Sequence, residues 1–149
     1  MNIQTINNDL LSELLSQASM SERKRVAFDL RTTPEDTSQR MLNAMQPGTV
    51  VPIHRHDDTS ETCICIKGKL DVIFYSELPN MDAGGPGRDF TEILRVTLSP
   101  ESGNHGCQIP QGVWHSVHVT EPTIIMEAKD GAYKPSPSTG SGTVSSTVK

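Results

Sequence analysis

Apolar residues follow a helical period in one stretch near the start of the chain. Residues 7–19 read NNDLLSELLSQAS, and positions 10, 11, 14, 15 and 18 carry four leucines and an alanine on one face of an α-helix. Asn8 or Asp9 can cap the start of this helix, because a short polar side chain accepts a hydrogen bond from an unpaired backbone N–H group. We expect the leucine face to pack on the core or on a second subunit.

After residue 24 the helical period gives way to short apolar runs separated by turn residues. Glycine and proline together number 21 of the 149 residues, which favours a turn-rich β protein. The predicted strands are residues 25–30, 38–45, 50–56, 62–66, 70–75, 90–98, 106–109, 114–119 and 123–128. Residues 38–45 also fit a helix, but a strand there could form a meander with residues 50–56 after the turn at Pro47-Gly48. The runs 62–66 and 70–75 flank a short turn that contains Gly68, so they predict a hairpin.

This order of elements predicts one all-β domain, a jelly-roll barrel of two sheets, preceded by a single α-helix. Residues 1–24 form the helix and its connection, residues 25–134 the barrel, and residues 135–149 a tail rich in Ser, Thr, Gly and Pro. That composition is typical of a flexible segment. Residues 76–89 hold three glycines and two prolines, and we expect them to form a long loop.

The net negative charge of the chain makes nucleic acid and anionic membranes unfavourable as partners. Thirteen Lys and Arg stand against eighteen Asp and Glu, for a net charge of −5, and such a chain is a poor ligand for nucleic acid or for an anionic membrane. No apolar run is long enough to span a bilayer, and no signal peptide is visible. The three cysteines are an odd number and are expected to be reduced thiols, which suits a cytoplasmic protein.

Two histidines and a glutamate form a candidate metal site between Gly48 and Gly68. His54 and His56 are two residues apart, so on a strand their imidazoles point to the same face. The sequence DDTS that follows is typical of a turn, and a turn there could bring Glu61 back beside both rings. Two imidazoles and a carboxylate suit a first-row divalent cation.

A second segment supplies a further candidate ligand. The spacing from Gly48 through the two histidines and Glu61 to Gly68 resembles the first cupin motif at every fixed position, and Pro110, Gly112 and His115 resemble the core of the second. Gly103 lies one residue further from Pro110 than the usual glycine, and Val119 stands where that motif ends in asparagine. The chain therefore resembles a single-domain cupin whose metal ligands are His54, His56, Glu61 and His115.

A closer resemblance, to the WbuC-type cupin-fold metalloproteins, covers residues 8–134. It rests on the segment SERKR after the helix and on the positions Gln39, Arg40, Asn43, Ala44, Trp114, Glu127, Lys129, Gly131 and Tyr133. That family is found around bacterial polysaccharide gene clusters, so the resemblance implies a metal site and a carbohydrate context. Cupins commonly pair through sheet edges, and the resemblance implies a homodimer with a small-molecule ligand in the barrel.

The chemistry of the site leaves three functions open. Zn, Fe, Ni, Mn or Cu would suit the four ligands, and four protein ligands leave one or two positions open on the ion. The preferred hypothesis is that the metal acts as a Lewis acid in the isomerisation or epimerisation of a carbohydrate or similar polar metabolite. The alternatives are an Fe(II)-dependent dioxygenase and a non-catalytic metal-dependent binding or sensing module.

Several other residues are expected outside the ligand set. His118 is expected on the outer face of its strand and His105 in a solvated turn, so neither belongs to the ligand set. Cys63 and Cys65 share a face with Glu61 and are more readily small buried residues than metal ligands. Arg40 and Asn43 could hold a substrate or pair with Asp71 or Glu92, and on a regular strand only one of the two faces the cavity. Trp114 is expected to point out of the barrel, as a packing or dimer residue.

Overall fold

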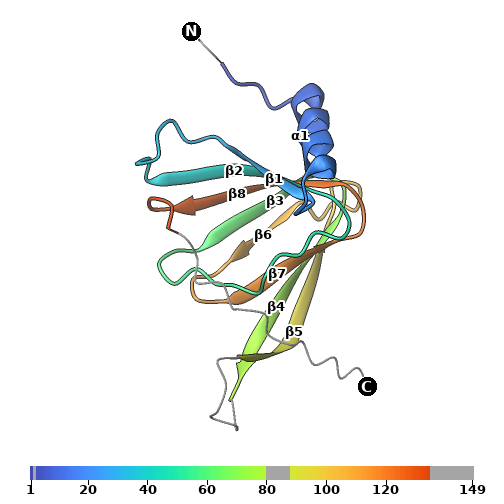
Figure 1. The fold of residues 1–149 in the computed structure, drawn as a ribbon. Helices are drawn as coiled ribbons and strands as arrows, with labels where there is room; N and C mark the ends of the chain where they lie inside the picture. Colours follow the sequence, from blue (N-terminus) through green and yellow to red (C-terminus); the bar gives the residue numbers. More distant parts are fainter. Residues whose placement is uncertain (2, 80–87, 135–149) are drawn as a thin grey trace.

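The computed structural model describes residues 1, 3–79 and 88–134. It contains one helix, α1 (Asn8–Met20), followed by strands β1 (Arg25–Asp29), β2 (Ser38–Met45), β3 (Glu61–Lys67), β4 (Leu70–Leu78), β5 (Asp89–Leu98), β6 (Gly106–Ile109), β7 (Trp114–Val119) and β8 (Thr123–Asp130). The strands form two antiparallel sheets, with the orders β1-β2-β8-β3-β6 and β5-β4-β7 (Figure 1). The predicted all-β domain with an N-terminal helix is confirmed. The predicted tail at 135–149 lies outside the described residues.

Alternation along β2 divides its side chains between two environments. Leu42 and Ala44 are fully buried beneath α1, which packs on β1, β2 and β8. Met41, Asn43 and Met45 point the other way and line the cavity between the sheets. This period of two explains why residues 38–45 form a strand, as predicted, and why the helix covers the outer face of the larger sheet.

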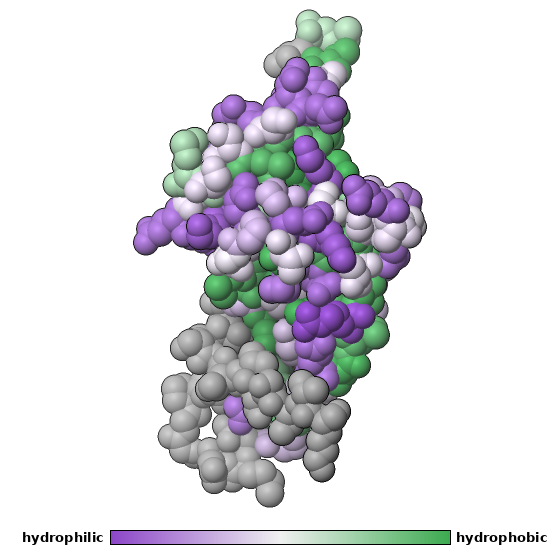
Figure 2. All heavy atoms as spheres, turned by 90° about the vertical axis from the view of Figure 1, so that its right-hand side faces the viewer, coloured by the Kyte–Doolittle hydropathy of each residue, from purple (hydrophilic) through white to green (hydrophobic). Residues whose placement is uncertain are grey.

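The barrel core lies between the two sheets. Its buried residues come from both: Met45, Cys63, Cys65, Ile109 and Ile125 from the larger sheet, and Leu70, Val72, Phe74, Leu98 and Val119 from the smaller. The three cysteines are free thiols, and burial raises the pKa of the Cys63 thiol. On the side of the molecule shown in Figure 2, hydrophilic and hydrophobic residues are intermixed. Within the described part of the chain, no helix has the length and apolar character needed to cross a membrane.

Two predictions about strand pairing are wrong. Residues 62–66 and 70–75 do not form a hairpin, because β3 and β4 belong to different sheets. Gly68 makes the corner between them with a φ of +83°, and a Cβ there would lie 2.3 Å from the carbonyl oxygen of Pro122. Residues 50–56 do not form a strand or a meander with β2, whose neighbours are β1 and β8. They form one isolated bridge, between His54 and His115, so the described residues contain eight strands where the sequence predicted nine.

The predicted helix caps, Asn8 and Asp9, are wrong, because the observed cap is Asn7, the residue before Asn8. The side chain of Asn7 accepts a hydrogen bond of 3.0 Å from the backbone N–H of Leu10, and Asn8 is the first helical residue. Asn7→Ala is therefore expected to lower the free energy of unfolding by about 1 kcal/mol. In chemical denaturation the control Asn8→Ala should change it by less than about 0.5 kcal/mol. Equal effects of the two substitutions would contradict this cap.

Candidate metal centre

The three predicted histidines meet inside the barrel. One ring nitrogen from each of His54, His56 and His115 lies within 4.8 Å of the others. The ring centroids of His54 and His115 are 4.3 Å apart, and that of His56 lies 5.2 Å and 5.7 Å from them. The three rings line one wall of a cavity of about 520 Å³, a volume in the range of small-molecule sites.

Backbone pairing brings these histidines together although residues 50–56 are irregular. His54 and His115 exchange two backbone hydrogen bonds, of 3.0 Å and 2.8 Å. The N–H of Gly112 donates to the carbonyl of His56 over 2.8 Å, and the hydroxyl of Ser116 donates to the carbonyl of Val51 over 2.6 Å. The segment is therefore fastened to β7 and the turn before it, which fixes both imidazoles beside His115.

Hydrogen bonds set the tautomers of two of the rings. Nδ1 of His54 lies 2.9 Å from the carbonyl oxygen of Pro52, and Nδ1 of His115 lies 2.9 Å from that of Val113. A carbonyl oxygen can only accept, so Nδ1 of each ring carries the proton and Nε2 keeps its lone pair. Backbone carbonyls orient metal-binding histidines in this way in many proteins.

Electrostatics keep the same two rings neutral. Burial, and then the charge of His115, lower the pKa of His54 to about 4. Burial also lowers the pKa of His115, whose side chain is almost fully enclosed. A neutral imidazole is the form that binds a metal ion, so both rings are in the binding form near pH 7.

A metal ion fits this cluster because a buried ring nitrogen of His115 has a lone pair that no described hydrogen-bond donor contacts. Nε2 of His115 is buried and has no hydrogen-bond partner among the described residues. An unpaired buried polar atom is costly, and native structures rarely keep one without a function. The three histidines can therefore bind a metal, and nitrogen ligands suit several divalent transition metals.

The structure places Glu61 next to one histidine of the cluster. Glu61 begins β3 and is 3 % exposed, with Oε2 at 2.9 Å from Nε2 of His56 and 3.0 Å from Nζ of Lys129. Burial opposes its ionisation, but the contact with His56 and the charge of Lys129 lower the pKa of Glu61 to about 2. The carboxylate is therefore charged. Neighbouring ligands of one metal ion are ~3 Å apart, so its distance from His56 is compatible with a shared ion.

Two charged residues of β8, Glu127 and Lys129, line the cavity, although the sequence pattern gave them no role in the site. Alternation places Ile125, Glu127 and Lys129 on the inner face of the strand, where they line the cavity. The side chain of Asn43 donates a hydrogen bond of 2.5 Å to Glu127. Burial and then the charge of Glu61 raise the pKa of Glu127, so neighbouring carboxyls have pKa values shifted in opposite directions. The two-residue alternation along 123–130 could have predicted that Glu127 and Lys129 face the cavity.

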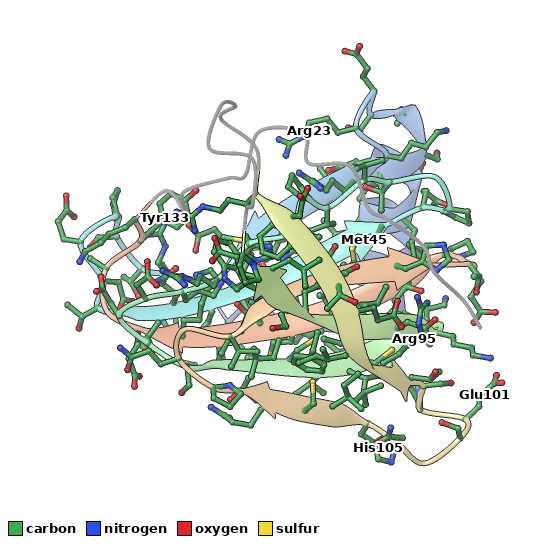
Figure 3. All side chains as sticks on the ribbon, turned by 90° about the horizontal axis from the view of Figure 1, so that it is seen from below. Arg23, Met45, Arg95, Glu101, His105 and Tyr133 are labelled. Carbon is green, nitrogen blue, oxygen red and sulfur yellow. The ribbon has the colours of Figure 1, made fainter. Side chains whose placement is uncertain are left out.

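The remaining assigned residues lie outside the cluster of rings. His118 and His105 are exposed, and Figure 3 shows His105 on the outside of the barrel. Asn43 lines the cavity, whereas Arg40 forms an ion pair with Asp36 at 2.9 Å. The prediction that only one of the two faces inward is therefore confirmed. The predicted pairing with Asp71 or Glu92 is wrong.

Cys63 and Trp114 are both buried, and they differ in what they contact. Cys63 lines the cavity. Trp114 packs edge-on against Phe90 at 4.9 Å, beneath the guanidinium of Arg55 at 4.6 Å. This is the packing role predicted for Trp114.

Comparison with known proteins identifies the fold. Residues 6–83 match the family model described as Domain of unknown function (DUF6016). A cupin 2 domain-containing protein from Halorhodospira halophila superposes with a TM-score of 0.57 at 14 % identity, covering 78 % of this chain and 70 % of that one. KdgF from Halomonas sp. gives 0.50 at 13 % identity, covering 88 % of each chain.

A third solved structure is the capsular polysaccharide assembling protein CapF from Staphylococcus aureus. Its TM-score is 0.54 at 20 % identity, and the match covers 73 % of this chain but 27 % of CapF. No curated protein matches the chain. The similar structures show that the jelly-roll barrel is a cupin fold.

Proposed function

We propose that this chain, which belongs to the DUF6016 family, is a metal-dependent cupin protein that acts on a carbohydrate or a similar polar metabolite. The proposed metal ligands are His54, His56, Glu61 and His115. The observation that carries this proposal is the buried Nε2 of His115, which has no hydrogen-bond partner among the described residues and lies in a cluster of three imidazoles.

The residues around the cluster favour a site that binds a further molecule. Three imidazoles and one carboxylate leave coordination positions unfilled by protein, and the adjoining cavity is lined by polar and apolar side chains. A divalent transition metal held there (Zn, Fe, Ni or Mn) would supply a Lewis acid that polarises a carbonyl or a pair of hydroxyl groups. The chain's own contribution is to hold the substrate against this wall of the cavity.

Isomerisation or epimerisation also needs a group that accepts a proton from carbon. Glu127 meets the geometric requirement, because its carboxyl lines the same cavity as the three histidines. The hydrogen bond from Asn43 fixes one of its oxygens. We assign Glu127 as the proton acceptor, a role for which the sequence offered no candidate. A positioned base of this kind contributes about 10²- to 10⁴-fold to a rate.

The proposal extends to the biological context and the oligomeric state. A carbohydrate context accords with the shared fold of CapF, which is described as a capsular polysaccharide assembling protein. We also propose a homodimer. The edge strand β5 exposes Ile93 at 62 % and Leu94 at 54 %, and an open edge with apolar side chains favours pairing with a second copy.

The test is proton exchange at carbon. Metal-loaded protein in D₂O, supplied with a panel of aldoses and ketoses, should incorporate deuterium next to the carbonyl carbon, as followed by NMR. Glu127→Gln should slow this exchange by at least about 100-fold and keep the metal. Glu77→Gln is the control, since Glu77 is exposed on β4 and contacts Arg88 at 3.5 Å. Unchanged exchange in Glu127→Gln would contradict the assignment. Oxygen consumption by iron-loaded protein, without exchange, would contradict the isomerase proposal.

A further inference from the structure

Two arginines line the cavity that contains the three histidines, and they come from a different part of the fold. Arg23 lies in the connection after α1 and Arg25 begins β1. Both contribute to the wall of the cavity of about 520 Å³. Figure 3 shows Arg23 beside α1, and Tyr133 also lines the cavity.

The guanidinium groups of these two residues differ from those of every other arginine in the chain. The other five each lie within ion-pair distance of a carboxylate: Arg31 with Asp29, Arg40 with Asp36, Arg55 with Asp57, Arg88 with Glu77, and Arg95 with Asp71 and Glu92. Among the described residues, no ion pair includes Arg23 or Arg25. At this wall of the cavity, two positive charges therefore have no contact with a carboxylate from residues 1, 3–79 or 88–134.

Arg25 is held in place although it lacks an anionic partner. Its Nη1 donates a hydrogen bond of 2.7 Å to the carbonyl oxygen of Val50, the first residue of the segment 50–56 that carries His54. The residue is half-buried. Burial, and then the charge of Arg23, lower the pKa of Arg25, while the charge of Glu127 raises it, so Arg23 and Arg25 repel each other although Glu127 offsets part of that repulsion. An anion placed between them would relieve this repulsion and gain charge-assisted hydrogen bonds.

The two carboxylates that line the cavity, Glu61 and Glu127, are in direct contact with other side chains and not with the two arginines. Glu61 contacts His56 and Lys129, and Glu127 accepts the hydrogen bond from Asn43. Arg23 and Arg25 therefore have donors to offer to a molecule that enters from outside. A planar guanidinium fork matches a carboxylate or a phosphate in geometry.

We infer that Arg23 and Arg25 form an anion-binding subsite, so that the ligand of this cavity is a small polar molecule carrying a carboxylate or phosphate group. The inference deepens the proposed function, because the anionic group would hold the ligand while its polar part faces the histidines. It assigns a chemical class to the ligand: a sugar acid or sugar phosphate is favoured over a neutral sugar.

The test compares three probes that share one ring: glucose, glucuronate and glucose 6-phosphate. Binding is measured by calorimetry and by NMR chemical shifts, with chelator present so that direct binding to a metal contributes nothing. At least one anionic probe should bind about 10-fold or more tightly than glucose, the gain expected from one charge-assisted contact. Which of the two anionic probes binds tighter distinguishes a carboxylate from a phosphate ligand.

Variants assign the preference to the two arginines. Arg23→Gln and Arg25→Gln should each reduce the anion preference by several-fold, and the double variant should abolish it. Arg25→Lys should retain part of the preference, because the charge stays and the fork is lost. Arg95→Gln is the matched control: it removes an arginine that pairs with Asp71 and Glu92 and does not line the cavity. Arg23 is exposed, so its substitution separates binding from folding.

Three results would overturn the subsite: equal binding of all three probes, no binding of either anionic probe, or a preference that survives in the Arg23→Gln Arg25→Gln double variant. These outcomes are independent of the metal proposal. Loss of that proposal would appear as protein without bound metal, while the anion preference in chelator would remain.

Discussion

His115→Ala is expected to abolish stable metal binding. The substitution removes the buried Nε2 atom that has no other partner, while the backbone bridge to His54 stays in place. Loss of a residue that merely orients a ligand costs about 10- to 100-fold in affinity, so loss of the ligand itself should cost more than about 100-fold. Elemental analysis of purified protein and titration with Zn²⁺ in a competing chelator would both measure this.

A control on the same strand separates the site from the surface. His118 also lies on β7 but is exposed, and His118→Ala should keep the full metal content. His56→Ala gives a second test with less risk to folding, since its side chain is 15 % exposed. Full metal occupancy in both His115→Ala and His56→Ala would show that the ligand assignment is wrong.

Gly68→Ala is expected to be the most destabilising alanine substitution of a turn glycine. The residue has a φ of +83°, and the new Cβ would meet backbone and side-chain atoms of Pro122 and Thr123 at 2.3–2.9 Å. Backbone strain and overpacking each cost about 1–3 kcal/mol, so together they should lower the free energy of unfolding by roughly 3–5 kcal/mol. Denaturant titration followed by circular dichroism measures the change.

Gly112 provides the matched control for this effect. Its φ of +77° is similar, but apart from its two chain neighbours no described residue has an atom within 4 Å of the position where a Cβ would be placed. Gly112→Ala should therefore show the strain alone, about 1–2 kcal/mol. A loss of the same size at both positions would mean that close packing at the corner between β3 and β4 has no special importance.

The corner at Gly68 also shows where prediction from sequence ends. A glycine between two apolar runs correctly predicted a sharp change of direction. The same local pattern serves a hairpin and a crossing from one sheet to the other, and the choice depends on the strands that flank each run. β3 pairs with β6 and β8, whereas β4 pairs with β5 and β7, and these partners are distant in sequence.

The candidate site was more predictable than the path of the chain through it. The prediction that His54 and His56 converge assumed a strand, and the structure shows an irregular segment. The rings still meet His115 because backbone hydrogen bonds fasten that segment to β7. The spacing of the histidines was therefore enough to predict that their rings converge, although the secondary structure assumed for the segment was wrong.

The positive wall of the cavity could not be predicted in the same way. Arg23 lies in the polar stretch that the sequence predicts as a connection after the helix, and Arg25 is the first residue of the predicted strand 25–30. Their position in the cavity depends on how α1 and β1 pack on β2. Among the described residues, these two arginines contact no carboxylate, whereas the other five arginines do, and a sequence does not show such pairings.

The position of a bound metal tests the central claim most directly. Protein loaded with Zn²⁺ would be crystallised and the ion located by its anomalous scattering. We expect one peak at about 2.0–2.2 Å from Nε2 of His54, His56 and His115 and from an oxygen of Glu61, with at least one coordination position not filled by protein. A peak held by other residues, no peak in the barrel, or an ion enclosed entirely by protein ligands would contradict it.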